Sequence, residues 1–460
     1  MTRKLSIVFL LATLALGCKG AGPAKEPSKD PSGNPSEEPS AEVKLEKFVL
    51  EVPVTEDWIY DSKPYFTVEV ENPNAVAVTA DATVKIYTDI GSSLKQTLTL
   101  SEEIPARGSK TLVINATEDL DPGFYKASIV VGKRVARNYF FGVNPSRIVS
   151  EPDFQPDFEE FWAAAKKQLE GIDMNAKTVK VAESGGQATY FVEMNSVPDG
   201  PDGDPVVVRG YWLTPTGGSK LPVIIHFFGY DSSPSPISLP WGDPAFCHFF
   251  LSTRGQMINN RKADQRSDGI EEDFKNIYGD WFGANFGDRD SYYYRGAFMD
   301  CVQAVRFMAE QPSSDMTHLF GEGSSQGGAF SYAAAALSDY PFTAIAPNVA
   351  FLGDFPDYFR IVSWPANTAK SKKGSMTDEQ MYAFLSYFDT KNLATLIPET
   401  CSVMASACLQ DGTCPPHTNL APFYNLGSTD KEIHFYPELQ HDIPAEWPQM
   451  TIDYFKARCK

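Results

Sequence analysis

The sequence predicts two folded parts, an immunoglobulin-like β-sandwich followed by an α/β domain with a mostly parallel sheet. Two observations support this prediction. Residues 43–145 contain short alternating strands separated by turn signals, whereas from residue 146 onward strand-like runs alternate with helical ones. The first pattern is typical of sandwiches, and the second is typical of a parallel sheet flanked by helices. A chain of 460 residues is long enough for both parts.

The first residues have the pattern of a targeting segment. Arg3 and Lys4 precede an apolar run over residues 5–16, which is too short to be a stable transmembrane helix. The run ends at Ala15-Leu16-Gly17-Cys18, which resembles a bacterial lipobox. We therefore expect residues 1–18 to be a lipoprotein signal peptide ending at a lipidated Cys18, with ordinary signal-peptide cleavage as the alternative.

A lipid on Cys18 would place the chain in the bacterial cell envelope, anchored to a membrane. Lys19 follows the cysteine in place of the Asp that marks inner-membrane retention in many bacteria, so we expect the outer membrane. Residues 19–42 carry a proline at every fourth position among Ser, Lys, Asp and Glu. Such a stretch has almost nothing to bury, so it is predicted to be a disordered tether.

The predicted sandwich rests on period-two alternation of apolar and polar residues, which buries one face of each strand. Turn signals such as Asn72-Pro73-Asn74 and Asp121-Pro122-Gly123 separate the runs. The expected strands are 48–52, 66–70, 84–87, 97–100, 111–114, 124–131 and 139–141. No catalytic set is evident in this part, which favours a spacer or packing module; carbohydrate binding is the alternative.

The α/β domain, expected over residues 146–460, opens with an amphipathic helix around Phe158 and Trp162. A second helical face is formed by Phe298, Val302 and Val305. The expected strands are 206–213, 223–228, 318–320, 344–349, 402–409 and 432–436, with a further helix at 329–337.

Composition excludes several classes of function. The net charge of −19 argues against nucleic acid as a partner. The seven cysteines form no C-x-x-C pair and the six histidines no H-E-x-x-H, so neither a metal nor another cofactor is predicted. Cys401, Cys408 and Cys414 are close enough in sequence to favour a disulfide in an oxidising compartment, although the sequence does not determine the pairing.

The most informative motif is Gly323-Ser324-Ser325-Gln326-Gly327, a G-x-S-x-G between a short strand and an Ala-rich helix. This strand–turn–helix context is that of the nucleophile elbow of α/β-hydrolases, which exposes the serine. The glycines permit the sharp turn and close approach of neighbouring chains. Ser325 is therefore the predicted nucleophile.

In that fold the acid and the base follow the serine in this order, each just past a strand end. Asp411 comes directly after the apolar run ending at Leu409, and His441 follows the strand that ends at Tyr436. His417, His434 and Asp442 are weaker candidates. The predicted roles are attack by Ser325, proton transfer by His441 and stabilisation of the imidazolium by Asp411.

An oxyanion hole in this fold combines the backbone N–H after the nucleophile with one from the loop after an earlier strand. The first donor is that of Gln326. The strand ending at Phe228 runs into Gly229-Tyr230, so the second is that of Tyr230.

Several segments together resemble the acetyl xylan esterase / cephalosporin C deacetylase family (carbohydrate esterase family 7), over about residues 150–460. They are 224–230, Arg254-Gly255-Gln256, Tyr292-Tyr293-Tyr294-Arg295 with Asp300, the elbow 323–328, and Asp411 with Cys414-Pro415-Pro416. The resemblance implies metal-free hydrolysis of small acyl esters, chiefly acetyl groups on xylo-oligosaccharides, by Ser325, Asp411 and His441. Family members are typically cytoplasmic hexamers, so a homo-oligomer is an open expectation.

The chain departs from the family in having Phe228 where a histidine is usual and Asp442 where glutamate is usual. Three aromatic residues, Trp281, Tyr294 and Trp364, are candidates for stacking on a sugar, with core packing as the alternative for each. The expected function is therefore hydrolysis of acetyl esters on carbohydrates. The alternatives are a broader esterase or serine peptidase of the same fold, and a non-catalytic surface glycan-binding lipoprotein.

Overall fold

The structure is a computed structural model, and it describes residues 45–231, 242–256, 258 and 276–459. The described residues from Glu46 onward belong to one compact unit. The predicted signal peptide, Cys18 and the tether lie outside the described residues. Within the described part, no helix is long and apolar enough to cross a bilayer.

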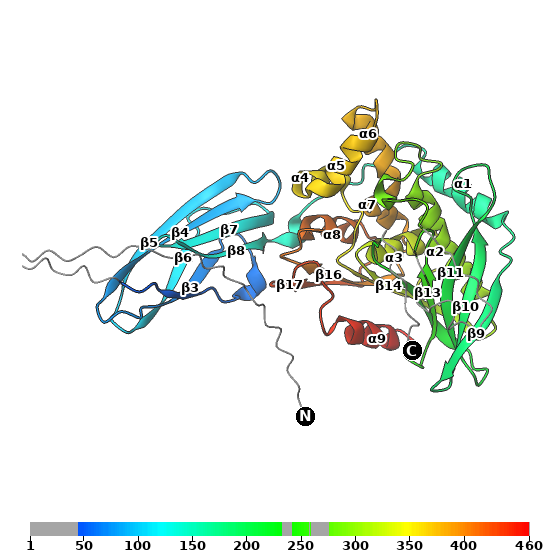
Figure 1. Cartoon of the computed structure of the whole chain (residues 1–460), viewed down its shortest axis with the longest axis horizontal. Coiled ribbons are helices and arrows are strands. Elements are labelled where there is room, and N and C mark those ends of the chain that lie inside the picture. The colour runs from blue at the N-terminus through cyan, green and yellow to red at the C-terminus, as the bar shows by residue number, and fades with distance from the viewer. Residues whose placement is uncertain (1–44, 232–241, 257, 259–275, 460) are drawn as a thin grey trace, which may run out of the picture. The chain divides into compact units, whose positions relative to one another are not determined.

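Residues 49–143 form two β-sheets, which we call the β unit (Figure 1). The strands of the three-stranded sheet are, in spatial order, β1 (Val49–Glu51), β3 (Tyr65–Glu71) and β6 (Ser109–Asn115). Those of the five-stranded sheet are β2 (Ile59–Tyr60), β8 (Arg134–Val143), β7 (Gly123–Val131), β4 (Val78–Thr88) and β5 (Leu94–Ile104). Each of the seven predicted strands falls on one of these strands. The two-residue β2 was not predicted, because it is too short to show alternation.

Alternation explains why the two sheets share one core. On β3, Phe66, Val68 and Val70 are fully buried, and the residues between them are not. On β4, Ala80 to Ile86 alternate in the same way. Apolar side chains from both sheets form one buried cluster, so the hydrophobic effect holds the sheets together.

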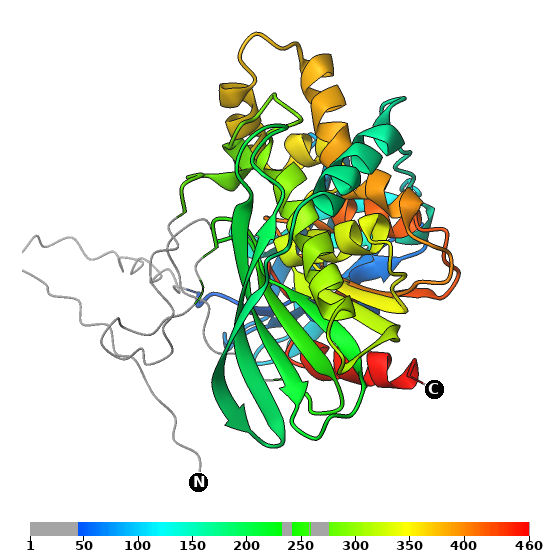
Figure 2. The same ribbon diagram turned by 90° about the vertical axis from the view of Figure 1, so that its right-hand side faces the viewer.

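The part of the chain after the β unit is built on a nine-stranded sheet. Its spatial order is β17 (Lys431–Tyr436), β16 (Ser402–Cys408), β15 (Ala344–Asn348), β14 (Ser314–Ser324), β12 (Leu221–Phe227), β13 (Cys247–Ser252), β11 (Val206–Pro215), β10 (Gln187–Ser196) and β9 (Lys177–Ser184). All pairings from β13 to β17 are parallel. Strands β11, β10 and β9 continue the sheet in antiparallel pairings, and Figure 2 looks onto this edge. The predicted mixed α/β fold is confirmed.

Some helices pack on the two faces of this sheet, and others pack on those helices. They are α1 (Phe158–Glu170), α2 (Tyr293–Ala309), α3 (Gln326–Leu337), α4 (Phe355–Ile361), α5 (Ser363–Lys372), α6 (Asp378–Leu385), α7 (Thr390–Leu393), α8 (Pro416–Tyr424) and α9 (Trp447–Ala457). Short 3₁₀ turns are η1 (Glu56–Trp58), η2 (Pro145–Arg147), η4 (Trp281–Gly283), η5 (Ser386–Phe388) and η6 (Ala394–Leu396).

The parallel strands are buried on both faces, as their continuous apolar runs require. On β12, Val223 and Ile225 pack into the core formed with α2 and α3. Between them, Ile224 points to the opposite face, where it joins the cluster that includes Phe320 and Phe455 of α9. In Figure 1, α9 accordingly lies below β16 and β17, and α3 and α8 lie above.

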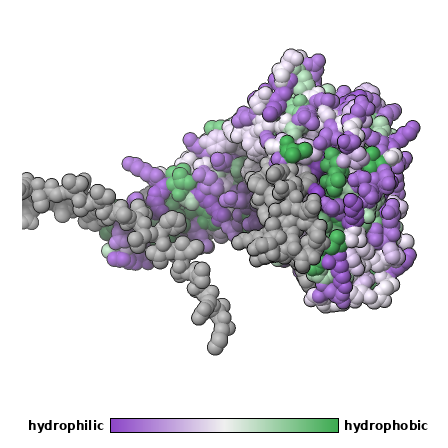
Figure 3. Space-filling view, turned by 45° about the vertical axis from the view of Figure 1, so that its right-hand side comes forward, coloured by the Kyte–Doolittle hydropathy of each residue, from purple (hydrophilic) through white to green (hydrophobic). Residues whose placement is uncertain are grey.

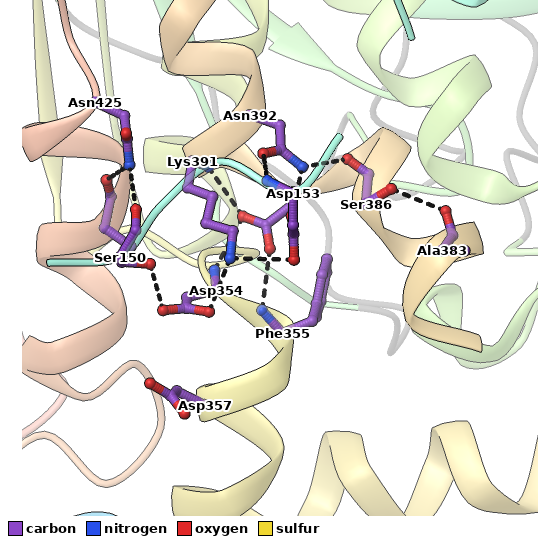
Figure 4. Close-up of polar contacts among 12 residues, drawn as sticks. Ser150, Asp153, Asp354, Phe355, Asp357, Ala383, Ser386, Lys391, Asn392 and Asn425 are labelled. Carbon is purple, nitrogen blue, oxygen red and sulfur yellow. Dashed lines mark hydrogen bonds and ion pairs between the residues drawn. The ribbon is translucent and has the colours of Figure 1, made fainter. Parts of the chain in front are cut away.

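The segment after the β unit is held by a buried polar cluster around Lys391 (Figure 4). The Lys391 ammonium lies 3.2 Å from Asp153 and 3.1 Å from Asp354. The hydroxyl of Ser150 donates to Asp354, and the amide of Asn392 donates to Asp153. Residues 150–153 are therefore fixed to the start of α4 and to α7.

Candidate active site

Ser325 occupies a sharp turn between β14 and α3. Its backbone has φ 59° and ψ −119°, a conformation that is costly for a residue with a Cβ. Two backbone hydrogen bonds over-determine this turn: Ser325 N–H donates to the Asn348 carbonyl at 2.9 Å, and Phe351 N–H donates to the Ser325 carbonyl at 2.9 Å. The predicted elbow is therefore present, with its serine at the strained position.

The elbow glycines are required by close packing. A Cβ at Gly327 would lie 2.1 Å from the carbonyl oxygen of Phe227, and one at Gly323 would lie 2.6 Å from the same oxygen. No side chain fits at these distances, so the motif's glycines let the end of β12 approach the elbow.

Asp411 and His441 form a hydrogen-bonded pair. The distance from Asp411 Oδ2 to His441 Nδ1 is 2.7 Å. Asp411 is buried, and its other oxygen, Oδ1, accepts the backbone N–H groups of Thr413 and Cys414, each at 2.8 Å. Because an ionised carboxylate can only accept, Nδ1 carries the proton and Nε2 is left as the basic nitrogen.

Two further side chains connect this pair with the elbow. Cys414 is buried, and burial raises the pKa of its thiol well above the usual range against the lowering effect of nearby Ser325, so the thiol stays neutral. The Asn348 amide donates to Ser324 Oγ at 2.9 Å and to the carbonyl of Asp442 at 3.4 Å. The structure thus places the three predicted residues just after the carboxyl ends of β14, β16 and β17, with β15 between β14 and β16.

The loop after β12 lies against the elbow: a Cβ at Gly229 would be 4.0 Å from the Cβ of Ser325. The Gln256 amide donates to the Gly229 carbonyl at 3.1 Å, and its oxygen accepts the Thr253 N–H at 3.0 Å. In a trans peptide the C=O and N–H point in opposite directions. Gln256 therefore fixes the direction of the Tyr230 N–H, the predicted second oxyanion donor.

Arg254 is buried and joins its own loop to α2 and to residues 197–199. Its guanidinium makes hydrogen bonds of 3.0 and 2.7 Å to Asp300 on α2, one of 2.8 Å to Asp199 and one of 2.9 Å to the Val197 carbonyl. Burial lowers the pKa of Arg254, but Asp300 and Asp199 outweigh that effect and raise it. A Cβ at Gly296 would lie 2.1 Å from this guanidinium, so α2 needs a glycine there.

We expect Gln256→Met to lower kcat for an ester substrate by about 10- to 100-fold. Methionine has a similar length but cannot donate to the Gly229 carbonyl, so the Tyr230 N–H is no longer fixed. Loss of a whole oxyanion donor costs about 10²–10³ in kcat, and a misdirected donor costs less.

Steady-state kinetics beside Gln311→Met test this expectation. Gln311 donates to the Phe307 carbonyl at the end of α2, and its loss should leave kcat near that of the wild type. Equal rates in the two variants would contradict the role given to Gln256.

The three aromatic candidates differ in exposure. Trp281 and Tyr294 are fully buried, and Tyr294 donates to the side chain of Gln326 at 2.9 Å. Trp364 is 37% exposed, and its ring lies 6.0 Å from that of Tyr230. The face in Figure 3 is mainly hydrophilic with small hydrophobic areas. A sugar contact by Trp281 or Tyr294 remains a prediction that would require neighbouring side chains to move.

The weaker histidine candidates have other partners. His417 Nε2 lies 3.1 Å from Asp357, and Nδ1 lies 3.3 Å from Asp89 of the β unit. Although burial lowers the pKa of His417, these two carboxylates raise it to about 9. His434 packs against Trp447, with ring centroids 6.2 Å apart.

One group of side chains in the described part of the chain is close enough to hold a metal ion: Asp354, Asp357 and His417. Its carboxylates already have charged partners, because Asp354 pairs with Lys391 and Asp357 with His417. The described cysteines, including Cys401, Cys408 and Cys414, are all free. The disulfide expected from their spacing is therefore not formed.

Sequence reasoning missed Asn348 and the role of Gln256. Asn348 is a polar residue at the carboxyl end of the apolar strand β15, and this placement was a usable signal. The role of Gln256 was not readable, because it depends on a backbone carbonyl 27 residues earlier in the chain.

A family model, acetyl xylan esterase (AXE1), matches residues 148–458. This match covers well over half of the chain. The chain belongs to the acetyl xylan esterase family. It is therefore a carboxylic ester hydrolase, as the sequence predicted. The β unit lies outside the matched residues.

A curated relative, the acetyl esterase Axe7A of Xylanibacter ruminicola (strain ATCC 19189 / DSM 19721 / CIP 105475 / JCM 8958 / 23), is 24% identical over 416 residues. The match spans 89% of this chain and 90% of the relative. It is longer than the region that defines the acetyl xylan esterase family, so it also includes residues of the β unit.

Two solved acetyl xylan esterases share the fold. Acetyl xylan esterase 1 from Thermoanaerobacterium sp. JW/SL YS485 has a TM-score of 0.56 and 22% identity, covering 68% of this chain and 96% of its own. The enzyme from Paenibacillus sp. R4 has a TM-score of 0.55 and 27% identity, with coverage of 67% and 96%. These likenesses agree with an α/β-hydrolase-like fold.

Proposed function

We propose that this protein hydrolyses acetyl esters on carbohydrates such as acetylated xylo-oligosaccharides, with Ser325, His441 and Asp411 as its catalytic triad. The observation that carries the proposal is the 2.7 Å Asp411–His441 pair next to a strained serine elbow. Membership of the acetyl xylan esterase family and the similarity to an acetyl esterase support an acetyl substrate on a carbohydrate.

The reaction proceeds in two steps through an acyl-enzyme. Ser325 Oγ attacks the acetyl carbon while His441 Nε2 takes its proton, and Asp411 stabilises the imidazolium. The backbone N–H groups of Tyr230 and Gln326 bind the developing oxyanion. His441 returns the proton to the sugar oxygen as it leaves. Water then attacks the acetyl-enzyme in the same way, releasing acetate and free Ser325.

A substrate series tests the proposal. Acetate release from acetylated xylo-oligosaccharides should exceed release of acyl chains longer than about four carbons, because a small acyl pocket excludes them. Equal rates for acetate and long-chain esters would favour a broader esterase, and cleavage of a peptide bond would favour a peptidase. Binding of xylan without any hydrolysis would favour a glycan-binding lipoprotein.

We also propose that Trp364 stacks on the sugar ring of the substrate. It is the exposed member of the three aromatic candidates and it contacts Tyr230 and Phe351. Trp364→Ala should raise KM for an acetylated oligosaccharide and leave KM for a small chromogenic acetate unchanged. An unchanged KM for both substrates would remove Trp364 from the substrate site.

For the β unit we propose an immunoglobulin-like topology, supported by two sheets with one shared core. An experimental structure with another strand connectivity would overturn it.

For Cys18 we propose lipidation and anchoring in the cell envelope, supported by the lipobox-like sequence. Labelling with radioactive palmitate should be lost in Cys18→Ser, and labelling that persists would refute the assignment.

A further inference from the structure

The β unit packs on the two segments that carry Asp411 and His441. Leu409 and Leu420 flank Asp411 in sequence, are fully buried, and belong to the core cluster of the β unit. On the second segment, the ring of Phe435 lies 6.5 Å from that of Phe124 on β7. The core of the β unit is therefore continuous with the loop that presents the catalytic acid.

Gln410, the residue before Asp411, joins three parts of the molecule. Its side-chain oxygen accepts the N–H of Phe140 on β8 at 2.8 Å, and its amide donates to the Phe140 carbonyl at 3.0 Å. The same amide donates to the Pro437 carbonyl at 2.7 Å. The backbone N–H of Gln410 donates to the backbone carbonyl of Leu439 at 3.0 Å. Gln410 thus ties the acid segment both to the β unit and to the segment that leads to His441.

Charged contacts between the β unit and the same two segments lie near Gln410. Arg137 of β8 pairs with Glu438 at 2.9 Å, three residues before His441. Asp89, which follows β4, lies 3.3 Å from His417 on α8, in the segment that follows Asp411. Partly exposed pairs such as the first contribute little energy. These charged pairs show, however, that the β unit contacts the same two segments, residues 409–420 and 435–438.

We propose that the β unit sets the positions of Asp411 and His441, with Gln410 as the positioning residue that transmits the constraint. The inference rests on the proposed function, because it requires that Asp411 and His441 act in catalysis. Without the Phe140 contacts, Gln410 keeps its bonds to Pro437 and Leu439, but the acid segment loses its hydrogen bonds to the β unit. A catalytic group misplaced by about 1 Å costs about 100-fold in rate, so this constraint is large enough to matter.

The test is Gln410→Met in the full chain, assayed on a chromogenic acetate ester. Methionine keeps the length of the side chain but removes its three hydrogen bonds. We expect kcat to fall by about 10- to 100-fold with little change in KM. The matched control is Gln449→Met at an exposed position of α9, where Gln449 donates to Asp453, and its kcat should equal that of the wild type.

A double-mutant cycle with Asp411→Asn separates positioning from a general structural effect. If Gln410 acts through Asp411, adding Gln410→Met to Asp411→Asn should lower kcat by less than about threefold further, because residues that act as one unit are not additive. Full multiplication of the two losses would overturn the proposal.

Gln410→Asn provides a second variant in case the methionine variant does not fold. Its amide remains polar but is one methylene shorter, so it no longer reaches Phe140, and kcat should fall in the same direction. If Ser325→Ala is inactive while both Gln410 variants keep the wild-type kcat, only the positioning role fails. If Ser325→Ala is as active as the wild type, the proposed function itself fails.

Discussion

Replacing Asp411 with asparagine is expected to lower kcat by about 10⁴-fold without unfolding the protein. The carboxylate accepts the proton on His441 Nδ1 at 2.7 Å, which leaves Nε2 basic. An asparagine amide turned toward His441 would donate instead, and the imidazole would then hold its proton on Nε2, where it cannot accept one from Ser325. The same change in another serine hydrolase triad costs about 10⁴ in kcat.

The matched control for this variant is Asp453→Asn. Asp453 is exposed on α9 and accepts a hydrogen bond from Gln449. Steady-state kinetics should give a wild-type kcat for Asp453→Asn, and thermal unfolding should show both variants folded. A folded Asp411→Asn with more than about a tenth of the wild-type kcat would remove Asp411 from the triad.

The largest expected effect on stability is that of Lys391→Met. Lys391 is buried between Asp153 and Asp354, and the carboxylate of buried Asp389 lies beside them. Burial raises the pKa of Asp389 to about 7, against the lowering effect of Lys391. Removing the cation leaves the buried carboxylates of Asp354 and Asp389 without their cationic partner, which typically costs about 3–5 kcal/mol in the free energy of unfolding.

Denaturant unfolding should be measured in parallel for Lys373→Met. Lys373 pairs with the exposed Asp378 at 2.5 Å on the surface, and such pairs contribute about 0–1 kcal/mol. Equal losses of stability in the two variants would show that the Lys391 cluster does not fix residues 150–153 as described.

The places of Ser325, Asp411 and His441 in the fold were predictable from sequence because they follow from chain order and strand ends. The G-x-S-x-G motif marks the elbow, and Asp411 and His441 each come within five residues of the end of an apolar strand, β16 or β17. Parallel strands bring their carboxyl ends to one edge of the sheet, so chain order alone predicts that these residues lie at the same edge. The mixed α/β fold followed from the same periodicities.

Contacts between distant segments were not predictable. The bonds between Phe140 and Gln410 join residues 270 positions apart, and no local pattern marks either residue. The sequence therefore suggested a spacer or packing module without showing where it packs, and the structure has it docked on the segments that carry Asp411 and His441. The burial of Trp281 and Tyr294 was not predictable either. The sequence around an aromatic residue does not show whether its ring is exposed or covered by other side chains.

The most direct test of the central claim is acetate release from acetylated xylo-oligosaccharides by the wild type and by Ser325→Ala. The wild type should release acetate, and the variant, folded by thermal unfolding, should be slower by about 10³-fold or more, as removal of a triad serine usually shows. Acetate release by Ser325→Ala at the wild-type rate would contradict the proposed serine mechanism.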